Sequence, residues 1–204
     1  MTDTFDFLDG NGHVPAHRHP NGGGWVADTA RVAESAYIGP DAFVYGNAVV
    51  CGNAEVSDNA VASDNAFVYG NAVVSDNAMV CGKAMVSGKA MVSGNAWVHG
   101  NAVVSDNAVV CGNAMVCGKA WVHGNAVVCG NAALNRGEYT ETPVTITRSD
   151  GYTFTLQCDG GVIAGCRDFT RKQALAHWGD PEHHKHAESM AILTALYALA
   201  DARK

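Results

Sequence analysis

Residues 94–108 read GNAWVHGNAVVSDNA, and residues 118–132 read GKAWVHGNAVVCGNA. Both copies fall within a six-residue frame that runs from Gly22 to Asn135 without an insertion. The third residue of this frame is almost always Ala and the fifth is usually Val. Residues two positions apart point to the same side of an extended strand, and the intervening Gly-Asn, Asp-Asn or Gly-Lys pairs favour turns. The frame therefore predicts very short strands joined by two-residue turns.

The repeat predicts a coil and not a series of hairpins, because odd and even hexads do not differ. A chain that bends the same way at every turn closes a triangular coil of three hexads. Each further coil then stacks about 4.8 Å from the one before it. We expect an all-β solenoid of about six 18-residue coils over 22–135, with Ala and Val inside.

These residues resemble the hexapeptide-repeat family of left-handed parallel β-helices, whose aliphatic–small–x–x–small–x pattern is met by VSDNAV at 104–109. The handedness is implied by this resemblance, and the repeat period alone does not give it. The opening GGGWVADTARV and the GNAxVxGNA runs are also similar to a subgroup of repeat proteins from bacterial genomes and phages. The resemblance implies a protein that assembles as a trimer, and the expected location is cytoplasmic (the host cytoplasm for a phage protein).

The fourth residue of each hexad points outward and is seldom charged. Sorting by 18 gives a first column of Trp25, Phe43, Val61, Met79, Trp97 and Met115. The second column is Arg31, Val49, Phe67, Met85, Val103 and Trp121, and the third is Tyr37, Glu55, Val73, Met91, Val109 and Val127. Monomers rarely expose apolar patches of this length. We therefore expect a homotrimer that associates through Trp25, Phe43, Phe67, Met79, Met85, Met91, Trp97, Met115 and Trp121.

Composition narrows the class of function. The net charge of −7 argues against extended nucleic acid and anionic membranes as partners. No apolar run is long enough for a membrane helix, and the first ten residues do not look like a signal peptide. The seven cysteines show no C-x-x-C spacing, so reduced thiols in a cytosol are the simplest interpretation.

The segments outside the repeat are predicted to be small. Residues 1–21 form a lead-in or cap, and residues 136–204 form a tail with a hairpin (143–147 and 152–157), a third strand near 161–165 and two helices. A capping box, Thr170 to Gln173, starts the first helix, which ends near Trp178. Asp180 and Pro181 are expected to begin a second helix that runs to about Ala202. We expect the tail to cover the last coil or to pack between subunits.

His99 and His123 are the only histidines of the coil region. In the acyltransferases of the resembling family a histidine at a subunit boundary acts as general base. Here the two histidines lie 24 residues apart, which is not a whole number of coils, so they fall on different faces and record a duplicated segment. The coil also lacks the loop insertion that shapes the acceptor site in that family. These residues would be catalytic only if the protein is an acyl-CoA-dependent enzyme.

Metal sites are not predicted. Cys81, His99 and Cys117 share one corner column, but the column is otherwise filled by small and aromatic residues. Cys111 and Cys129 are neighbours on another face. The histidine clusters GHVPAHRHP and HWGDPEHHKH have weak ligand spacing, and no cofactor is expected.

An anion site is the remaining candidate. Arg167, Arg171 and Lys172 surround the predicted helix start at Thr170, where backbone N–H groups favour a phosphate. In a trimer, Trp97 and Trp121 could stack on a base. The leading hypothesis is a non-catalytic trimer that binds a phosphate-bearing small molecule, a nucleotide or a host protein at subunit boundaries. The alternatives are an acyltransferase and a structural spacer of a phage or surface appendage.

Overall fold

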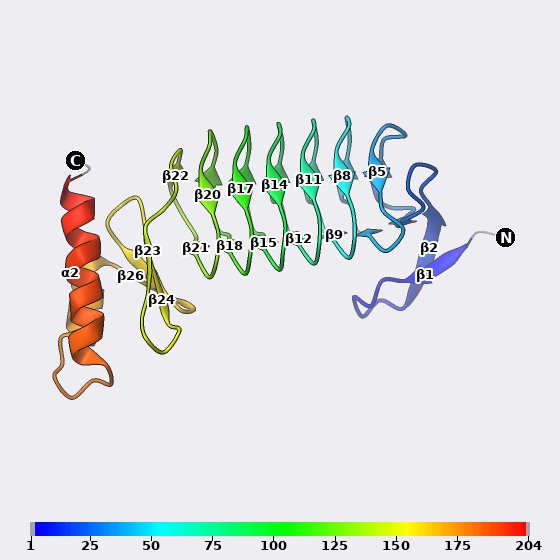
Figure 1. Ribbon diagram of the computed structural model, residues 1–204. Coiled ribbons are helices and arrows are strands. Elements are labelled where there is room, and N and C mark those ends of the chain that lie inside the picture. Colours follow the sequence, from blue (N-terminus) through cyan, green and yellow to red (C-terminus); the bar gives the residue numbers. More distant parts are fainter. Residues whose placement is uncertain (1–2, 203–204) are drawn as a thin grey trace.

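The computed structural model describes residues 3–202, so the first two residues of the expected lead-in and the last two of the tail lie outside the described residues. The chain forms a long parallel β-solenoid with a strand hairpin at one end and a small sheet with two helices at the other (Figure 1). This confirms the expected solenoid and its helical tail. The left-handed winding stays a prediction.

Three parallel sheets form the three faces of the solenoid. The first face holds β3 (Trp25–Ala27), β6 (Phe43–Val44), β9 (Val61–Ala62), β12 (Met79–Val80), β15 (Trp97–Val98), β18 (Met115–Val116) and β21 (Ala133–Leu134). The second face holds β4 (Arg31–Val32), β7 (Val49–Val50), β10 (Phe67–Val68), β13 (Met85–Val86), β16 (Val103–Val104), β19 (Trp121–Val122) and β22 (Glu138–Tyr139). The third face holds β5 (Tyr37–Ile38), β8 (Glu55–Val56), β11 (Val73–Val74), β14 (Met91–Val92), β17 (Val109–Val110) and β20 (Val127–Val128).

The register of these sheets follows the six-residue frame. Trp97 pairs with Met79 and with Met115, each 18 positions away. The three outward columns expected from the sequence therefore lie on three separate faces. The Ala and Val positions of the repeat form one core along the whole solenoid, and most of these side chains have no exposed area.

The turns are stabilised from one coil to the next. Asp76 lies in the left-handed region, with φ of 60°, and its carboxylate accepts a 2.8 Å hydrogen bond from Gly94 N in the following coil. Asn77 and Asn95 belong to a ladder of side-chain amides in which each Nδ2 donates to the next Oδ1. These side chains explain why the turn residues are nearly restricted to Gly, Asp, Asn and Lys.

The N-terminal segment is a hairpin of β1 (Thr4–Asp6) and β2 (His13–Arg18). Strand β2 pairs antiparallel with β3 and so covers the edge of the first face. The Phe5 ring stacks on Trp25 with centroids 4.6 Å apart, which buries part of that face at its first coil. These two strands were not expected from the sequence.

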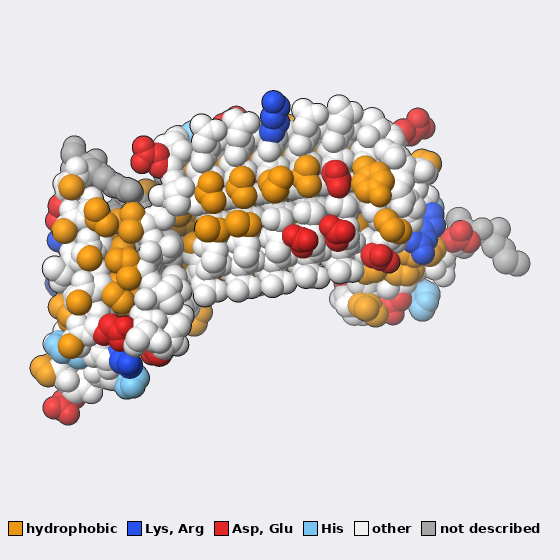
Figure 2. Space-filling view, viewed as in Figure 1, with side chains coloured by type: hydrophobic (Ala, Val, Ile, Leu, Met, Phe, Trp, Pro, Cys, Tyr) orange, Lys and Arg blue, Asp and Glu red, His pale blue; other side chains and the backbone are white. Residues whose placement is uncertain are grey.

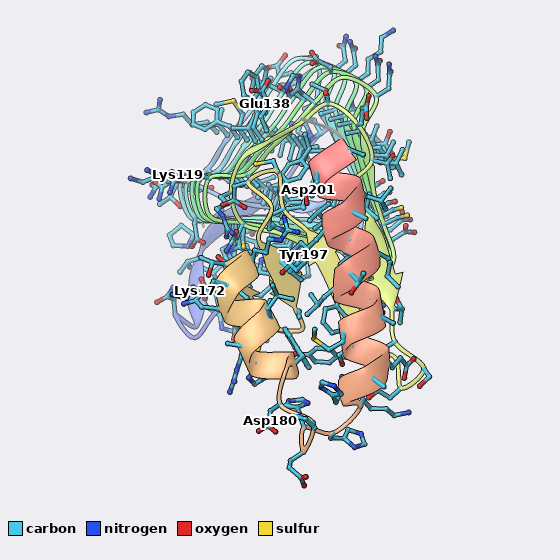
Figure 3. The ribbon with its side chains drawn as sticks, turned by 90° about the vertical axis from the view of Figure 1, so that its left-hand side faces the viewer. Lys119, Glu138, Lys172, Asp180, Tyr197 and Asp201 are labelled. Carbon is cyan, nitrogen blue, oxygen red and sulfur yellow. The ribbon has the colours of Figure 1, made fainter. Side chains whose placement is uncertain are left out.

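The tail contains an antiparallel sheet of β23 (Thr145–Thr147), β24 (Thr153–Leu156), β25 (Val162–Ala164) and β26 (Arg167–Phe169), followed by α1 (Arg171–Trp178) and α2 (His186–Ala202). The hairpin, the third strand and the capping box that starts α1 are confirmed, with Gln173 N donating to Thr170 Oγ1. Strand β26 was not expected. Figure 3 shows the two helices side by side at this end of the molecule.

The expected start of the second helix at Asp180 and Pro181 is wrong, because α2 begins at His186. The Asp180 side chain accepts from Glu182 N at 2.9 Å and so holds a local turn. Lys185 then adopts a left-handed φ of 61°, which a continuing helix does not allow. Two turns therefore separate the proline from the helix.

The tail covers the last coil by accepting its unpaired backbone donors. Ala133 N donates to Thr155 Oγ1 at 3.1 Å, and Val127 N donates to Thr142 Oγ1 at 3.3 Å. Arg136, at the end of the coil, forms ion pairs with Asp159 and Asp168 of the tail. Without these partners the last coil would leave N–H groups unsatisfied. No helix within residues 3–202 has the length and apolar character needed to cross a membrane.

We predict that replacing a turn glycine by alanine destabilises the protein more than replacing it by aspartate. Gly112 has φ of 69°, and a Cβ there would lie 2.9 Å from Gly130 N. Gly112→Ala should lower the free energy of unfolding by about 1–2 kcal/mol, because a left-handed alanine is strained. Gly112→Asp should cost less, because its carboxylate can accept from Gly130 N as Asp76 does from Gly94 N. Chemical denaturation measures both, and an aspartate variant less stable than the alanine variant would contradict this account of the turns.

Candidate functional site

The two Trp-Val-His copies lie on different faces of the solenoid. Trp97 and His99 lie on and directly after β15 of the first face, and Trp121 and His123 on and after β19 of the second face. In both copies the imidazole packs on the preceding indole, with ring centroids 4.3 Å and 4.4 Å apart. The structure therefore does not bring the two histidines, or the two tryptophans, into one site.

His99 sits in an apolar setting. Its Nε2 atom is buried without a hydrogen-bond partner, and burial lowers the pKa of the imidazole. The Trp97 indole donates a 3.1 Å hydrogen bond to Cys81 Sγ of the preceding coil. Cys81 lies 18 positions before His99 and so occupies the same column as that histidine. A neutral imidazole with one enclosed nitrogen is poorly placed to accept a proton from a substrate.

His123 has a different environment although its neighbours in sequence are the same. Its Nε2 atom lies 2.7 Å from Glu138 Oε1, and its Nδ1 atom lies 3.6 Å from Asp106 Oδ2. Both carboxylates are more than half exposed, whereas only 17% of the imidazole is accessible. The result is a histidine oriented between two carboxylates beside an exposed indole, which is an arrangement suited to proton transfer.

Neither carboxylate partner of His123 was identified from the sequence. Glu138 follows the break in the six-residue frame, and its strand β22 pairs with β19 in a shifted register that sets Glu138 beside Trp121. Asp106 belongs to the turn of the preceding coil on the same face, and its carboxylate also accepts from Gly124 N. The regular frame could have indicated Asp106, but the frame break hid Glu138.

A groove of about 550 Å³ lies between the last coil and the tail. Its lining includes Glu138, Tyr139, Glu141, Cys158 and Asp159, so it is acidic. Burial raises the pKa of the Tyr139 phenol well above its usual range, and that phenol donates to Gln157 Oε1 at 3.1 Å. An acidic lining disfavours an anionic ligand in this groove. The groove was not expected from the sequence, because its walls come from separate segments of the chain.

The candidate anion site has less positive charge available than the sequence indicates. Arg171 donates to both carboxylate oxygens of Asp201, at 2.9 Å each, and its guanidinium lies 4.5 Å from the centroid of the Tyr197 ring. Two backbone N–H groups at the start of α1 are already used in the capping box: Gln173 N donates to the Thr170 side chain, and Thr170 N donates to the Gln173 side chain. Tyr197 and Asp201 both come from α2 (Figure 3).

The other residues of that candidate remain on the surface. Arg167 lies on β26 and Lys172 in the first turn of α1, and both are exposed. Trp97 and Trp121 are 43% and 44% exposed but lie on the solenoid, on two different faces. Within one subunit these six residues therefore form no single binding site.

The histidines and cysteines form no obvious metal centre. Among residues 3–202, no group of three or more His, Cys, Asp or Glu side chains has an arrangement that could hold a metal ion. At the N-terminal end His17 Nδ1 lies 2.8 Å from Asp28 Oδ1. In the tail the rings of His177 and His183 lie 4.9 Å apart, in edge contact.

Comparison with known families agrees with the geometry. A family model described as the YdcK beta solenoid repeat matches residues 66–82, 80–100 and 108–124. All three segments lie within the coils, so the match supports a β-solenoid repeat in this chain. No curated protein and no solved structure matches the chain significantly.

We predict a pH-dependent contribution of His99 to stability. Because burial lowers its pKa in the folded state, the unfolded chain binds the proton more readily. The stability that depends on neutral His99 is thus fully present above the unfolded pKa of about 6.5, and it is lost as the pH falls below that value and through the lower pKa of the folded state. Thermal unfolding between pH 8 and pH 5 should show a steeper loss for the wild type than for His99→Ser. Serine is the matched replacement, because Ser63 occupies the same column. Equal pH profiles would contradict the prediction.

Proposed function

We propose that this protein is a non-catalytic homotrimeric β-solenoid that serves as a rigid binding scaffold. The observation that carries the proposal is the set of outward apolar rows on the solenoid. Exposed large residues include Met79 and Trp97 on the first face and Phe67 and Trp121 on the second. Each of these side chains is about two-fifths accessible, so burying the part that is still exposed stabilises an assembly by about 0.6–1.2 kcal/mol per side chain, two-fifths of the value for a fully exposed one.

The first and second faces are better suited than the third to form the interface (the seam) between subunits. The first row carries no charge along its length, and the second row is apolar between Arg31 at its start and Glu138 at its end. The third row contains Glu55, and beside it run the hydroxyls of Ser57, Ser75 and Ser93. Figure 2 shows this third face, whose hydrophobic row is interrupted by an acidic side chain. The proposed interface therefore excludes the third face, so Met91, which was included in the interface expected from the sequence, would face solvent.

The trimeric state is what the resemblance to hexapeptide-repeat proteins implies. A closed ring limits assembly to a fixed number of copies, and seams along two faces of each solenoid would set the three tails at the same end of the assembly. There the cations available to a phosphate-bearing ligand would be Arg167 and Lys172, because Arg171 is paired with Asp201. A protein ligand would use the same repeated end.

Two methionine substitutions test the assembly. Met79→Glu on the first face should convert the trimer to monomers, because a charge in an apolar seam is strongly unfavourable. Met91→Glu is the matched control, since Met91 is similarly exposed and lies in an equivalent strand of the third face. Native mass spectrometry and sedimentation velocity measure both. A monomeric wild type, or loss of the trimer only with Met91→Glu, would refute the proposed seam.

A second function, acyl transfer from an acyl-CoA, is favoured by one observation, the 2.7 Å contact between His123 and Glu138. Glu138 would orient the imidazole, and Nδ1 would serve as general base near Asp106. The exposed Trp121 ring would form one wall of the acceptor site. His99 has no comparable partner for its enclosed Nε2 atom.

A measurement of acyl transfer distinguishes the enzymatic function from the binding-scaffold function. If the protein transfers acyl groups, His123→Ala should reduce the rate by about 10²–10⁴-fold, the usual contribution of a general base. His99→Ala should leave the rate nearly unchanged and serves as the matched control. Release of free CoA thiol from acetyl-CoA with amine and sugar acceptors is the assay. No release with wild-type protein, or an equal loss in both variants, excludes His123 as the base.

A further inference from the structure

Cys111 and Cys129 form a pair of thiols on adjacent coils of the third face. Each residue directly follows a strand, and those strands pair in register, Val110 with Val128. Cys111 N donates to Val128 O at 2.9 Å, which fixes the backbones beside each other. Burial, and after it the neighbouring Cys129 thiol, raises the pKa of the Cys111 thiol, so the two side chains are close enough to interact. Cys129 is exposed and Cys111 is half-buried.

This pair is distinct among the coil cysteines. Cys81 and Cys117 share a column, but His99 lies between them. Cys51 has Ala33 and Tyr69 as its column neighbours. In the column of Cys111 and Cys129 the preceding coils carry serine, at Ser57, Ser75 and Ser93, so the fold requires no thiol at this corner. The requirements of the fold therefore do not explain why two consecutive coils carry cysteine where earlier coils carry serine.

The geometry suits a reversible disulfide. Neighbouring strands lie about 4.8 Å apart, which falls within the Cα separation of about 4.4–6.8 Å that disulfides span. The Cβ atoms of aligned residues on parallel strands remain about as far apart as their Cα atoms, so the side chains must lean together to reach the usual disulfide Cβ separation of about 3.5–4.5 Å. A bond formed here would carry some strain, and strained, exposed disulfides are the readily reduced ones.

We propose that Cys111 and Cys129 are a redox modification site that forms an intrachain disulfide with a small-molecule disulfide as oxidant. The thiolate of one cysteine, Cys129 being the more exposed, attacks a sulfur of the oxidant and releases the first thiolate. The Cys111 thiolate then attacks Cys129 Sγ, forms the Cys111–Cys129 bond and releases the second. Two protein thiols are oxidised, their two protons pass to solvent or to the leaving thiolates, and one oxidant disulfide is reduced to two thiols.

The position of the bond gives it a structural role. It would join the coil that contains β17 to the coil that contains β20, and β20 is the terminal strand of the third face. Beyond β20, the backbone donor of Val127 is satisfied by the Thr142 side chain of the following segment. A cross-link between the last two coils would therefore hold the end of the solenoid where no further strand covers it.

Peptide mapping tests the proposal with the full chain and oxidised glutathione as the probe. After alkylation of the remaining thiols, trypsin cleavage at Lys89, Lys119 and Arg136 places Cys111 in 90–119 and Cys129 in 120–136. We expect these two peptides to be joined by a bond that disappears on reduction. Because Cys117 lies in the first peptide, the cross-link must persist in the control variant Cys117→Ser. It must vanish in Cys111→Ser and Cys129→Ser, which restore the serine found in earlier coils.

Three outcomes overturn the proposal. One is complete alkylation of Cys111 and Cys129 when Cys158 or Cys166, which are exposed, have reacted with glutathione and so prove that the oxidant was active. The second is glutathione attached to Cys111 or Cys129 without a joined peptide. A cross-link that shifts to Cys117 in the wild type would equally refute the pair.

Discussion

The structure depends on one interaction, the parallel hydrogen bond between each coil and the next. The donor and acceptor are separated by 17 positions along the chain, as in Trp97 N to Ala114 O and Met115 N to Ala132 O, both at 2.9 Å. Because this offset is constant, a residue and its counterpart 18 positions later lie directly above one another. Every column of the solenoid follows from this, including the core, the turn ladders and the outward rows. An insertion of one residue would move all later side chains to wrong positions.

This regularity explains why the coils were predictable and the ends were not. Inside the repeat, the hexads share the same turn, Ala and Val positions, so the place of Val104 or Trp121 in its sheet follows from its residue number alone. At the N-terminal end the hairpin depends on Phe5 stacking on Trp25, a contact between segments that have no common pattern. In the tail, Asp180 and Pro181 carry an ordinary helix-start signal, but the left-handed Lys185 delays the helix. Tertiary contacts decided those elements.

The candidate sites show the same division. The sequence places His99 and His123 on different faces, since 24 residues is not a whole coil, and this holds in the structure. It could not show that one imidazole meets Glu138 and the other has an enclosed nitrogen. Likewise, Arg171 looked available until α2 brought Asp201 to it. For His123 and Arg171 the deciding partner, Glu138 or Asp201, comes from beyond the frame, from the segment that closes the solenoid.

The segments that cap the first and last coils limit the ways in which the outward apolar rows can be covered. A solenoid could grow end to end if its terminal coils offered unpaired strands. Here β2 occupies the first edge of the first face, and Asn21 Nδ2 donates to Ala36 O beside the first strand of the third face. At the other end, Thr155 and Thr142 accept the donors of the last coil. Stacking of copies along the solenoid axis is thereby disfavoured, whereas the flat sides remain apolar. The chain's own caps therefore leave the faces, where Phe67, Met79, Trp97 and Trp121 project, as the surfaces through which the proposed trimer would associate.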